Sequence, residues 1–303
     1  MPSVLPSPEE YEALTPRPGS PVWRAFNDVR ALHTAGYATL LQVAHPTVGA
    51  GVHQYSSFTK DPWGRLLRTL DYVHGTIYGG PAMAGEIGRR VRQMHTTIRG
   101  ERHDGVRYSA MEPDAFAWVH ATLASGIAEG HKRFIEPMTA AELEAFWTQW
   151  LDVGRLIGVR TRDLPEDWAG FEEYFARTVE EKLVWTPAVP EVLATLAKPA
   201  LPPIPWLPKP VFALLRGPAG LQLRLTTVGL LPPVLRDRLG LRFRRGEARA
   251  YRAIGAANRA AGPLIRGPLK EFGPSWVRWR SAALARGDVA AEHTRPETKP
   301  VAA

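Results

Sequence analysis

The sequence contains no cysteine among its 303 residues. Disulfide bonds, cysteine-ligated zinc, iron–sulfur clusters and thiol nucleophiles are therefore excluded together. The ligands that remain for a transition metal are nine histidines and the carboxylates.

Long apolar runs are also missing. No stretch approaches the roughly 20 uninterrupted apolar residues of a membrane-spanning helix, and the N-terminal sequence lacks the basic and apolar regions of a signal peptide. We therefore expect a cytoplasmic protein. Its 45% hydrophobic and 22% charged residues are typical of a globular protein with a sizeable core.

Positive charge is in excess, but it is unevenly distributed. The formal net charge is +8, whereas the segment from Arg236 to Ala303 alone carries +9, which leaves −1 for the first 235 residues. This distribution argues against nucleic acid as the main partner. Two roles remain for the basic C-terminal segment, a solvated surface or a weak contact with an anionic membrane.

Apolar residues recur with the period of an α-helix almost throughout, and no run alternates with period two. Helix starts are indicated at Asp61-Pro62, Glu112-Pro113 and Pro165-Glu166-Asp167, where an N-cap residue or an early proline precedes the pattern. Thr139 and Glu142 have the spacing of a capping box. We predict an all-α fold, a multi-helix bundle.

Prolines are concentrated in one region, since 11 of the 28 lie between Pro187 and Pro233. Proline removes a backbone donor and crowds the preceding turn, so we expect an extended Pro-rich connector at 187–210. The predicted organisation is an N-terminal extension at 1–20, a single all-helical domain at 21–286 that contains this connector, and a flexible C-terminal tail at 287–303.

Two histidines lie on apolar helical faces. His120 shares a face with Phe116 and Leu123, so its imidazole should be buried. His95 follows Arg92 by three residues and precedes Thr96 on another helix, which brings a cation, an imidazole and a hydroxyl to one patch. Two such helices, packed face to face, would suit a haem with a proximal histidine and a polar distal pocket. The alternative is that each histidine only satisfies a carbonyl in the core.

Other candidates have less distinctive patterns. Arg65 and Arg68 lie beside an apolar stripe and could neutralise haem propionates, although such arginines are also common as solvated charges. His45 is a further cofactor-binding candidate, and its place before Pro46 equally suits a turn or N-cap role. A non-haem metal site from His45 and His53 is only weakly indicated, because neither forms an H-E-x-x-H pair.

Several standard catalytic motifs are absent. The sequence has no G-x-G-x-x-G after a predicted strand, no Walker A sequence and no G-x-S-x-G nucleophile elbow. These absences argue against nucleotide-dependent enzymes and serine hydrolases.

Four segments together resemble the catalytic-domain family shared by rubber oxygenase (latex clearing protein) and MpaB-type oxygenases. In chain order they are LLQVAHPTVGAGVHQYSSFTKDPWGRLLRTLDYVHGTIYG, RRVRQMHTTIRG, YSAMEPDAFAWVHATL and LRLTTVGLLPPVLRDRLGL. The similarity runs from about Trp23 to about Arg286. It implies an all-helical protein with a globin-like core that binds haem b and uses dioxygen.

The resemblance also implies roles for individual residues. His120, in the WVHATL motif, takes the place of the proximal iron ligand. Arg92, His95 and Thr96 keep the family's distal spacing, with His95 where rubber oxygenases have a lysine. His95 therefore has two open roles, as a second iron ligand or as a base or hydrogen-bond donor that stays off the metal.

Two functions follow as expectations. The first is a haem b-dependent oxygenase that inserts dioxygen into an apolar, alkene-containing small molecule. The second is a non-catalytic haem-binding or electron-transfer protein, in which His95 and His120 both bind the iron. The resemblance favours the first.

Overall fold

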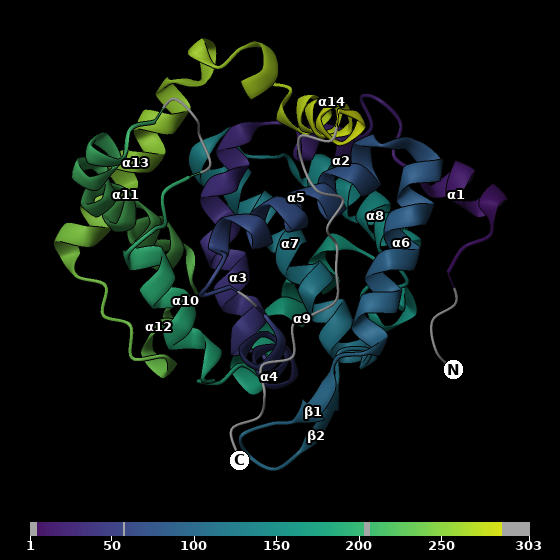
Figure 1. Ribbon diagram of the computed structural model, residues 1–303, viewed down its shortest axis with the longest axis horizontal. Coiled ribbons are helices and arrows are strands. Elements are labelled where there is room, and N and C mark those ends of the chain that lie inside the picture. The colour runs from purple at the N-terminus through teal and green to yellow at the C-terminus, as the bar shows by residue number, and fades with distance from the viewer. Residues whose placement is uncertain (1–4, 57, 203–206, 287–303) are drawn as a thin grey trace.

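The structure is a computed structural model and describes residues 5–56, 58–202 and 207–286. Regular structure in these residues is almost entirely helical (Figure 1), which confirms the predicted all-α class. The exception is a hairpin of two antiparallel strands, β1 (Arg99–Glu101) and β2 (Arg107–Ser109). Strands of three residues are too short to produce a detectable alternation in the sequence.

The described residues form helices of both α and 3-10 type. The α-helices are α1 (Pro8–Leu14), α2 (Pro21–Ala25), α3 (Ala35–Ala44), α4 (Pro46–Tyr55), α5 (Pro62–Tyr78), α6 (Gly80–Thr96), α7 (Pro113–Phe134), α8 (Ala140–Leu156), α9 (Trp168–Glu181), α10 (Ala188–Ala197), α11 (Lys209–Leu230), α12 (Pro233–Arg238), α13 (Arg245–Ala260) and α14 (Phe272–Ala285). The 3-10 helices are η1 (Val29–Thr34), η2 (Thr161–Asp163), η3 (Gly262–Leu264) and η4 (Gly267–Leu269). None of the helices in the described residues is long and apolar enough to cross a membrane.

Helix starts follow the local capping signals in the sequence. The Asp61 side chain accepts a hydrogen bond from the Gly64 amide at 2.8 Å, and α5 begins at the next residue. Thr139 and Glu142 form the expected capping box at the start of α8. Asp167 caps α9 through the Gly170 amide at 2.7 Å. These starts were predictable because each depends on residues within one turn.

Helix α7 lies in the middle of the molecule (Figure 1), between α3 and α8. Trp118 of α7 and Trp147 and Trp150 of α8 are buried. Their indoles donate to backbone carbonyls: Trp118 to Leu41 at 2.9 Å, Trp147 to Pro165 at 3.0 Å and Trp150 to His120 at 3.1 Å. Each indole N–H is thereby satisfied inside the core. The tryptophans join neighbouring helices by polar as well as apolar contacts.

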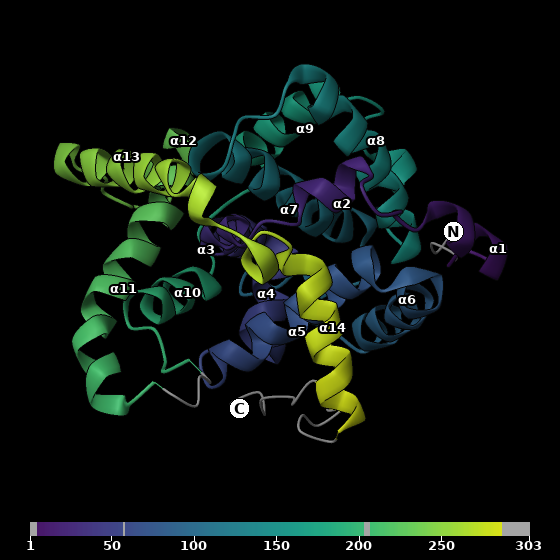
Figure 2. The same cartoon turned by 90° about the horizontal axis from the view of Figure 1, so that it is seen from above.

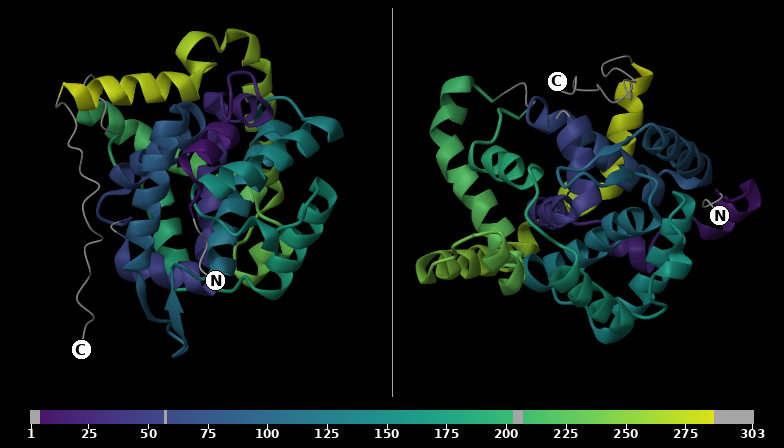
Figure 3. Two further views of the ribbon diagram at one scale, coloured as in Figure 1. Left: turned by 90° about the vertical axis from the view of Figure 1, so that its right-hand side faces the viewer. Right: turned by 90° about the horizontal axis from the view of Figure 1, so that it is seen from below.

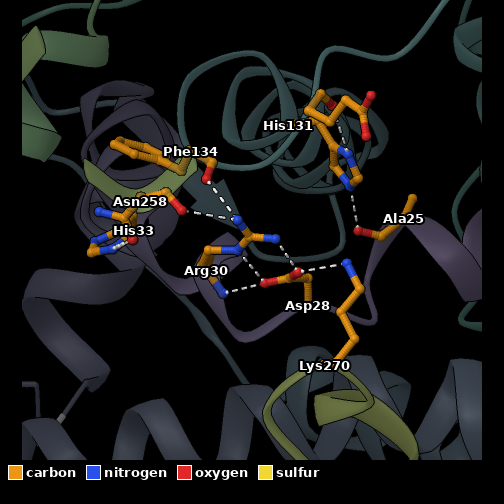
Figure 4. A network of polar contacts seen from close by, with 9 residues as sticks. Ala25, Asp28, Arg30, His33, His131, Phe134, Asn258 and Lys270 are labelled. Carbon is orange, nitrogen blue, oxygen red and sulfur yellow. Dashed lines mark hydrogen bonds and ion pairs between the residues drawn. The ribbon is translucent and has the colours of Figure 1, made fainter. Parts of the chain in front are cut away.

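A buried polar network attaches the C-terminal helices to this core (Figure 4). Arg30 Nη2 and Asp28 Oδ2 lie 2.6 Å apart, and their side chains are only 6% and 5% exposed. Arg30 Nη1 also donates to the Asn258 carbonyl of α13 at 3.0 Å, and Lys270 Nζ lies 3.2 Å from Asp28 Oδ2. The network therefore connects η1 with α13 and with the segment that precedes α14.

The N-terminal extension is docked on the domain rather than separate from it. Tyr11 of α1 donates its hydroxyl hydrogen to the Leu156 carbonyl at the end of α8, at 2.8 Å. At the other end of the chain, α14 packs on α5, where Arg280 Nε lies 2.8 Å from Asp71 Oδ2. Figure 2 shows α14 crossing α5 on the side away from α9.

The expected connector at 187–210 needs correction, because α10 occupies residues 188–197. Pro190 is the third residue of that helix, where the backbone amide has no intrahelical acceptor, so the missing donor costs nothing. Residues 203–206 of the connector and the predicted tail at 287–303 lie outside the described residues. Helix α11 follows and forms one edge of the molecule, with α10 on its inner side (Figure 3, right).

Candidate functional site where α6 meets α7

His95 and the central helix α7 are in contact. The His95 ring meets Phe116 of α7 edge-on, with centroids 5.2 Å apart and an interplanar angle of 86°. Helices α6 and α7, which the sequence predicts to face each other across a site, are therefore in contact at His95 and Phe116.

The two nitrogens of His95 have different surroundings. Nδ1 lies 2.7 Å from the Val91 carbonyl oxygen. Because a carbonyl only accepts, Nδ1 carries the hydrogen, which leaves the lone pair of neutral imidazole on Nε2. Nε2 makes no hydrogen bond within the described residues. Burial, assisted by the positive charge of Arg65, lowers the pKa of His95 and favours this neutral form.

His120 is more completely enclosed, at 2% exposure. Its ring stacks on the Trp150 indole with centroids 4.4 Å apart, and its Nε2 lies 2.8 Å from the Trp150 carbonyl oxygen. Its buried Nδ1 has no hydrogen-bond partner in the described residues. Burial lowers the pKa of His120 to about 4, so the ring is neutral and Nε2 is the donor.

Gly154 of α8 makes the position of His120 feasible. A Cβ atom at residue 154 would lie 2.8 Å from His120 Nε2 and 3.1 Å from the Thr161 methyl carbon, so only glycine leaves room for the ring. Sequence reasoning did not identify Trp150 or Gly154 as neighbours of His120. In this conformation His120 makes the carbonyl contact expected of a satisfied core histidine.

One face of α7 is incompletely covered. Phe116, Val119 and Leu123 follow one another at helical spacing, and all three are only half-buried although α7 is central. Side chains in the middle of a close-packed domain are normally enclosed on all sides. We call these three residues the open face of α7; His95 adjoins it through its contact with Phe116.

Arg65 supplies positive charge close to His95. It is half-buried, its Nη1 donates to the Ser56 hydroxyl at 2.8 Å, and its guanidinium carbon lies 5.7 Å from the centre of the Phe58 ring. No carboxylate of the described residues lies within ion-pair distance of it. Burial, followed by the charge of Arg68, lowers the pKa of Arg65 to about 10. Arg65 remains a cation and has room for an anionic partner.

The remaining predicted residues lie in other settings. Arg68 forms an ion pair with Asp61 at 3.7 Å. Arg92 has a buried Nη1 atom with no acceptor in the described residues. Thr96 is exposed and donates its hydroxyl hydrogen to the Gln93 carbonyl at 2.7 Å, so the structure does not direct it toward the His95 ring.

His45 joins helices instead of lining the open face. It is the residue between α3 and α4, is 5% exposed, and its Nε2 lies 3.2 Å from Asp114 Oδ2 of α7. This hydrogen bond, together with Lys182, lowers the pKa of Asp114 to about 2. The arrangement matches the turn and N-cap role that Pro46 indicates.

The described residues contain no group of three or more histidine, aspartate or glutamate side chains placed to hold a metal ion. His53, the weak non-haem candidate, lies 2.9 Å from Glu191 through Nδ1. A haem needs only one or two protein ligands, so this result bears on non-haem sites alone.

A separate hollow of about 470 Å³ lies on the opposite face of α7. Its lining includes Ser125 of α7 and the aromatic residues Trp168 and Phe171 of α9, together with acidic and basic side chains. The hollow includes none of the predicted site residues.

Comparison with known families gives one match. Residues 23–260 match the family described as ER-bound oxygenase mpaB/B'/Rubber oxygenase, catalytic domain. This range covers more than half of the chain and includes α6 and α7. No curated protein and no solved structure matched the chain.

Proposed function

Since the chain belongs to the mpaB and rubber oxygenase catalytic-domain family, we propose that this oxygenase-family domain uses haem b and dioxygen on an apolar, alkene-containing small molecule. The proposal includes a globin-like arrangement of helices around the haem. The main support for the proposal is the neutral form of the His95 imidazole and its position beside the open face of α7.

His95 has the features of an iron ligand. Metal-binding histidines usually donate one ring N–H to a carbonyl or carboxylate, which fixes the tautomer and directs the other nitrogen at the metal. In His95 the bond from Nδ1 to the Val91 carbonyl at 2.7 Å does this. The lowered pKa keeps the ring unprotonated, as ligation requires. His95 would therefore be able to hold the iron through Nε2 as a neutral imidazole.

His120 fits less directly, although the family resemblance gives it the proximal position. Its Nε2 is held by the Trp150 carbonyl, and the stacked indole covers one face of the ring. It would present Nε2 to iron only if the ring turned away from that carbonyl. We therefore assign the axial bond to His95 and retain His120 as the alternative that the experiment below distinguishes.

Arg65 fits the carboxylates of haem. A half-buried guanidinium without a carboxylate partner in the described residues can form charge-assisted hydrogen bonds with a propionate. The unpaired Nη1 of Arg92 offers a second donor. Arg65 lies on α5 and Arg92 on α6, the helix that carries His95.

Bound haem would supply dioxygen activation. The chain itself supplies a neutral imidazole, positive charge for the propionates, and an apolar wall from Phe116, Val119 and Leu123. A hydrocarbon substrate would pack on that wall and exclude water from the reacting centre.

The test is haem uptake by purified protein, followed by absorption spectroscopy. We expect the wild type to acquire a Soret band, His95→Ala to lose it, and His120→Ala to retain it. The matched control is His103→Ala, because His103 is exposed in the β1–β2 hairpin. Imidazole added to His95→Ala should restore the band if the loss is one of ligation.

Each other outcome is decisive. If the wild type takes up no haem, the proposed cofactor is wrong. If only His120→Ala loses the band, the protein binds haem, but its iron ligand is His120, as the family resemblance implies, and not His95. Rapid binding of carbon monoxide to the ferrous protein would indicate an open iron position and support an oxygenase, whereas its absence would support bis-histidine electron transfer.

A further inference from the structure

The first half of α11 exposes an apolar stripe to solvent. Val211, Leu214, Leu215 and Leu221 are 45%, 81%, 51% and 55% exposed, and Pro218 between them is exposed as well. The offsets from Val211 are three, four, seven and ten residues, so all five lie on one side of the helix. We call these five residues the α11 stripe.

The opposite side of the same helix is held against the body of the protein. Arg216 Nε donates to the Pro199 carbonyl at 3.0 Å, and its Nη2 donates to the Lys198 carbonyl at 3.3 Å. Gly220 lies so close to the Ala197 carbonyl that a side chain there would clash with it. The helix therefore cannot roll to bury its leucines without losing these contacts.

This orientation is the reverse of an ordinary surface helix. A surface helix turns its apolar side to the core and its charges to water. In α11, Leu214 faces water, whereas Arg216, although exposed, directs its guanidinium to carbonyls of the protein body. A contiguous exposed apolar patch on a soluble domain marks a site of interaction. The outer edge position of α11 in Figure 3 (right) leaves the stripe accessible.

The charge around the stripe identifies the class of partner. Between Glu191 and Asp237 the sequence contains no acidic residue. Its cations nearest the stripe are Lys198, Lys209 and Arg216, whereas Arg224, farther along α11, is paired with Glu247. Leucines flanked by cations without acids complement a bilayer that carries anionic lipid. A second copy of the chain would instead bring two like-charged segments together.

We propose that the α11 stripe docks this protein on the surface of a membrane containing anionic lipid. The helix lies in the plane of the interface, its leucines enter the boundary between headgroups and acyl chains, and the cations remain at the headgroups. The docking surface is therefore α11, and not the basic segment beyond Arg236 on which the sequence placed the membrane contact. The inference is independent of haem binding.

The test is sedimentation of the full chain with vesicles, either of phosphatidylcholine alone or of phosphatidylcholine containing phosphatidylglycerol. We expect the wild type to bind the anionic vesicles and to be released by salt. The double variant Leu214→Gln/Leu221→Gln should lose at least about tenfold in affinity, because two leucine side chains no longer transfer from water. Both positions are exposed, so thermal unfolding should be unchanged.

Two matched controls separate the alternatives. Leu264→Gln removes a leucine that is 79% exposed on η3, away from the stripe, and should bind as the wild type does. Arg249→Gln/Arg252→Gln removes two exposed cations of α13 and should weaken binding only a few-fold.

The proposal is overturned if the wild type does not bind anionic vesicles, or if the leucine variant binds as well as the wild type. It is overturned equally if the arginine variant alone abolishes binding, since the basic C-terminal segment would then be the contact. A wild type that sediments as a dimer without lipid, and as a monomer after Leu214→Gln, would show that a second copy covers the stripe.

Discussion

Arg30 and Arg65 are both withdrawn from water, but their surroundings are opposite. Arg30 is 6% exposed and forms an ion pair with Asp28, and the hydrogen bond to that carboxylate raises the pKa of Arg30. Arg65 is half-buried, has no carboxylate partner in the described residues, and its pKa falls to about 10. The carboxylate of Asp28 neutralises the first charge, whereas no carboxylate of the described residues neutralises the second.

The difference between the two arginines distinguishes a charge that stabilises the fold from one that is available to a ligand. A buried ion pair that is also bonded to backbone carbonyls orders the elements it joins. A cation without a counter-charge near an apolar surface lowers the stability of the folded protein. Such a residue is found where a bound ligand offsets that loss. The polar anchor of the fold therefore lies at Asp28 and Arg30, and the ligand proposed above would bind at Arg65.

The largest effect should come from breaking the compensated pair. Asp28→Ala leaves Arg30 buried without its carboxylate, and we expect a loss of about 3–5 kcal/mol in the free energy of unfolding, measured with urea. The control is Glu86→Ala, which removes the exposed pairs with Arg89 and Arg90 and should cost less than about 1 kcal/mol. Equal losses in the two variants would show that Arg30 is solvated when Asp28 is absent.

A second large effect on stability should come from the protonation of His120, a buried imidazole. The pKa of His120 is about 4 in the folded protein, against an ordinary value of 6.5. As pH falls below 6.5 the unfolded chain takes up this proton first, so stability is complete above pH 6.5 and is lost progressively down to pH 4. The loss from this group should be about 3 kcal/mol.

His120→Gln should flatten this part of the pH profile, as measured by urea unfolding at a series of pH values. Glutamine keeps an N–H donor for the Trp150 carbonyl but does not titrate. His74, whose pKa burial lowers to about 3, and His95 and His33, whose pKa values burial also lowers, contribute to the slope that remains. His103→Gln, at an exposed position, should leave the profile unchanged; an unchanged profile in His120→Gln would mean that water reaches the ring.

The sequence predicts those features that depend on neighbouring residues. The starts of α5, α8 and α9 follow from Asp61, Thr139 and Asp167, because each cap bonds within its own first turn. The burial of His120 follows from its apolar helical face. The hydrogen bond between His95 and the Val91 carbonyl is also local, because Val91 lies one helical turn before His95.

Features set by distant residues could not be predicted in this way. Trp150 is 30 residues from His120, and no periodicity within one helix shows that its carbonyl takes the imidazole N–H. The absence of a carboxylate beside Arg65 depends on the packing of several helices. Helix α10 differs from the expected connector for a local reason, because Pro190 lies in the first turn of the helix, where a proline is tolerated.

The smallest effect on stability should come from removing the uncompensated cation. Arg65→Met keeps the length of the side chain and removes its charge, so the free energy of unfolding without haem should stay within about 1 kcal/mol or rise. Haem affinity should fall about tenfold, because one charge-assisted hydrogen bond to a propionate is lost. Arg177→Met, at an exposed position on α9, is the control for both measurements. A large loss of stability in Arg65→Met, with haem affinity unchanged, would place Arg65 with Arg30 as part of the fold and would remove the distinction between the two arginines.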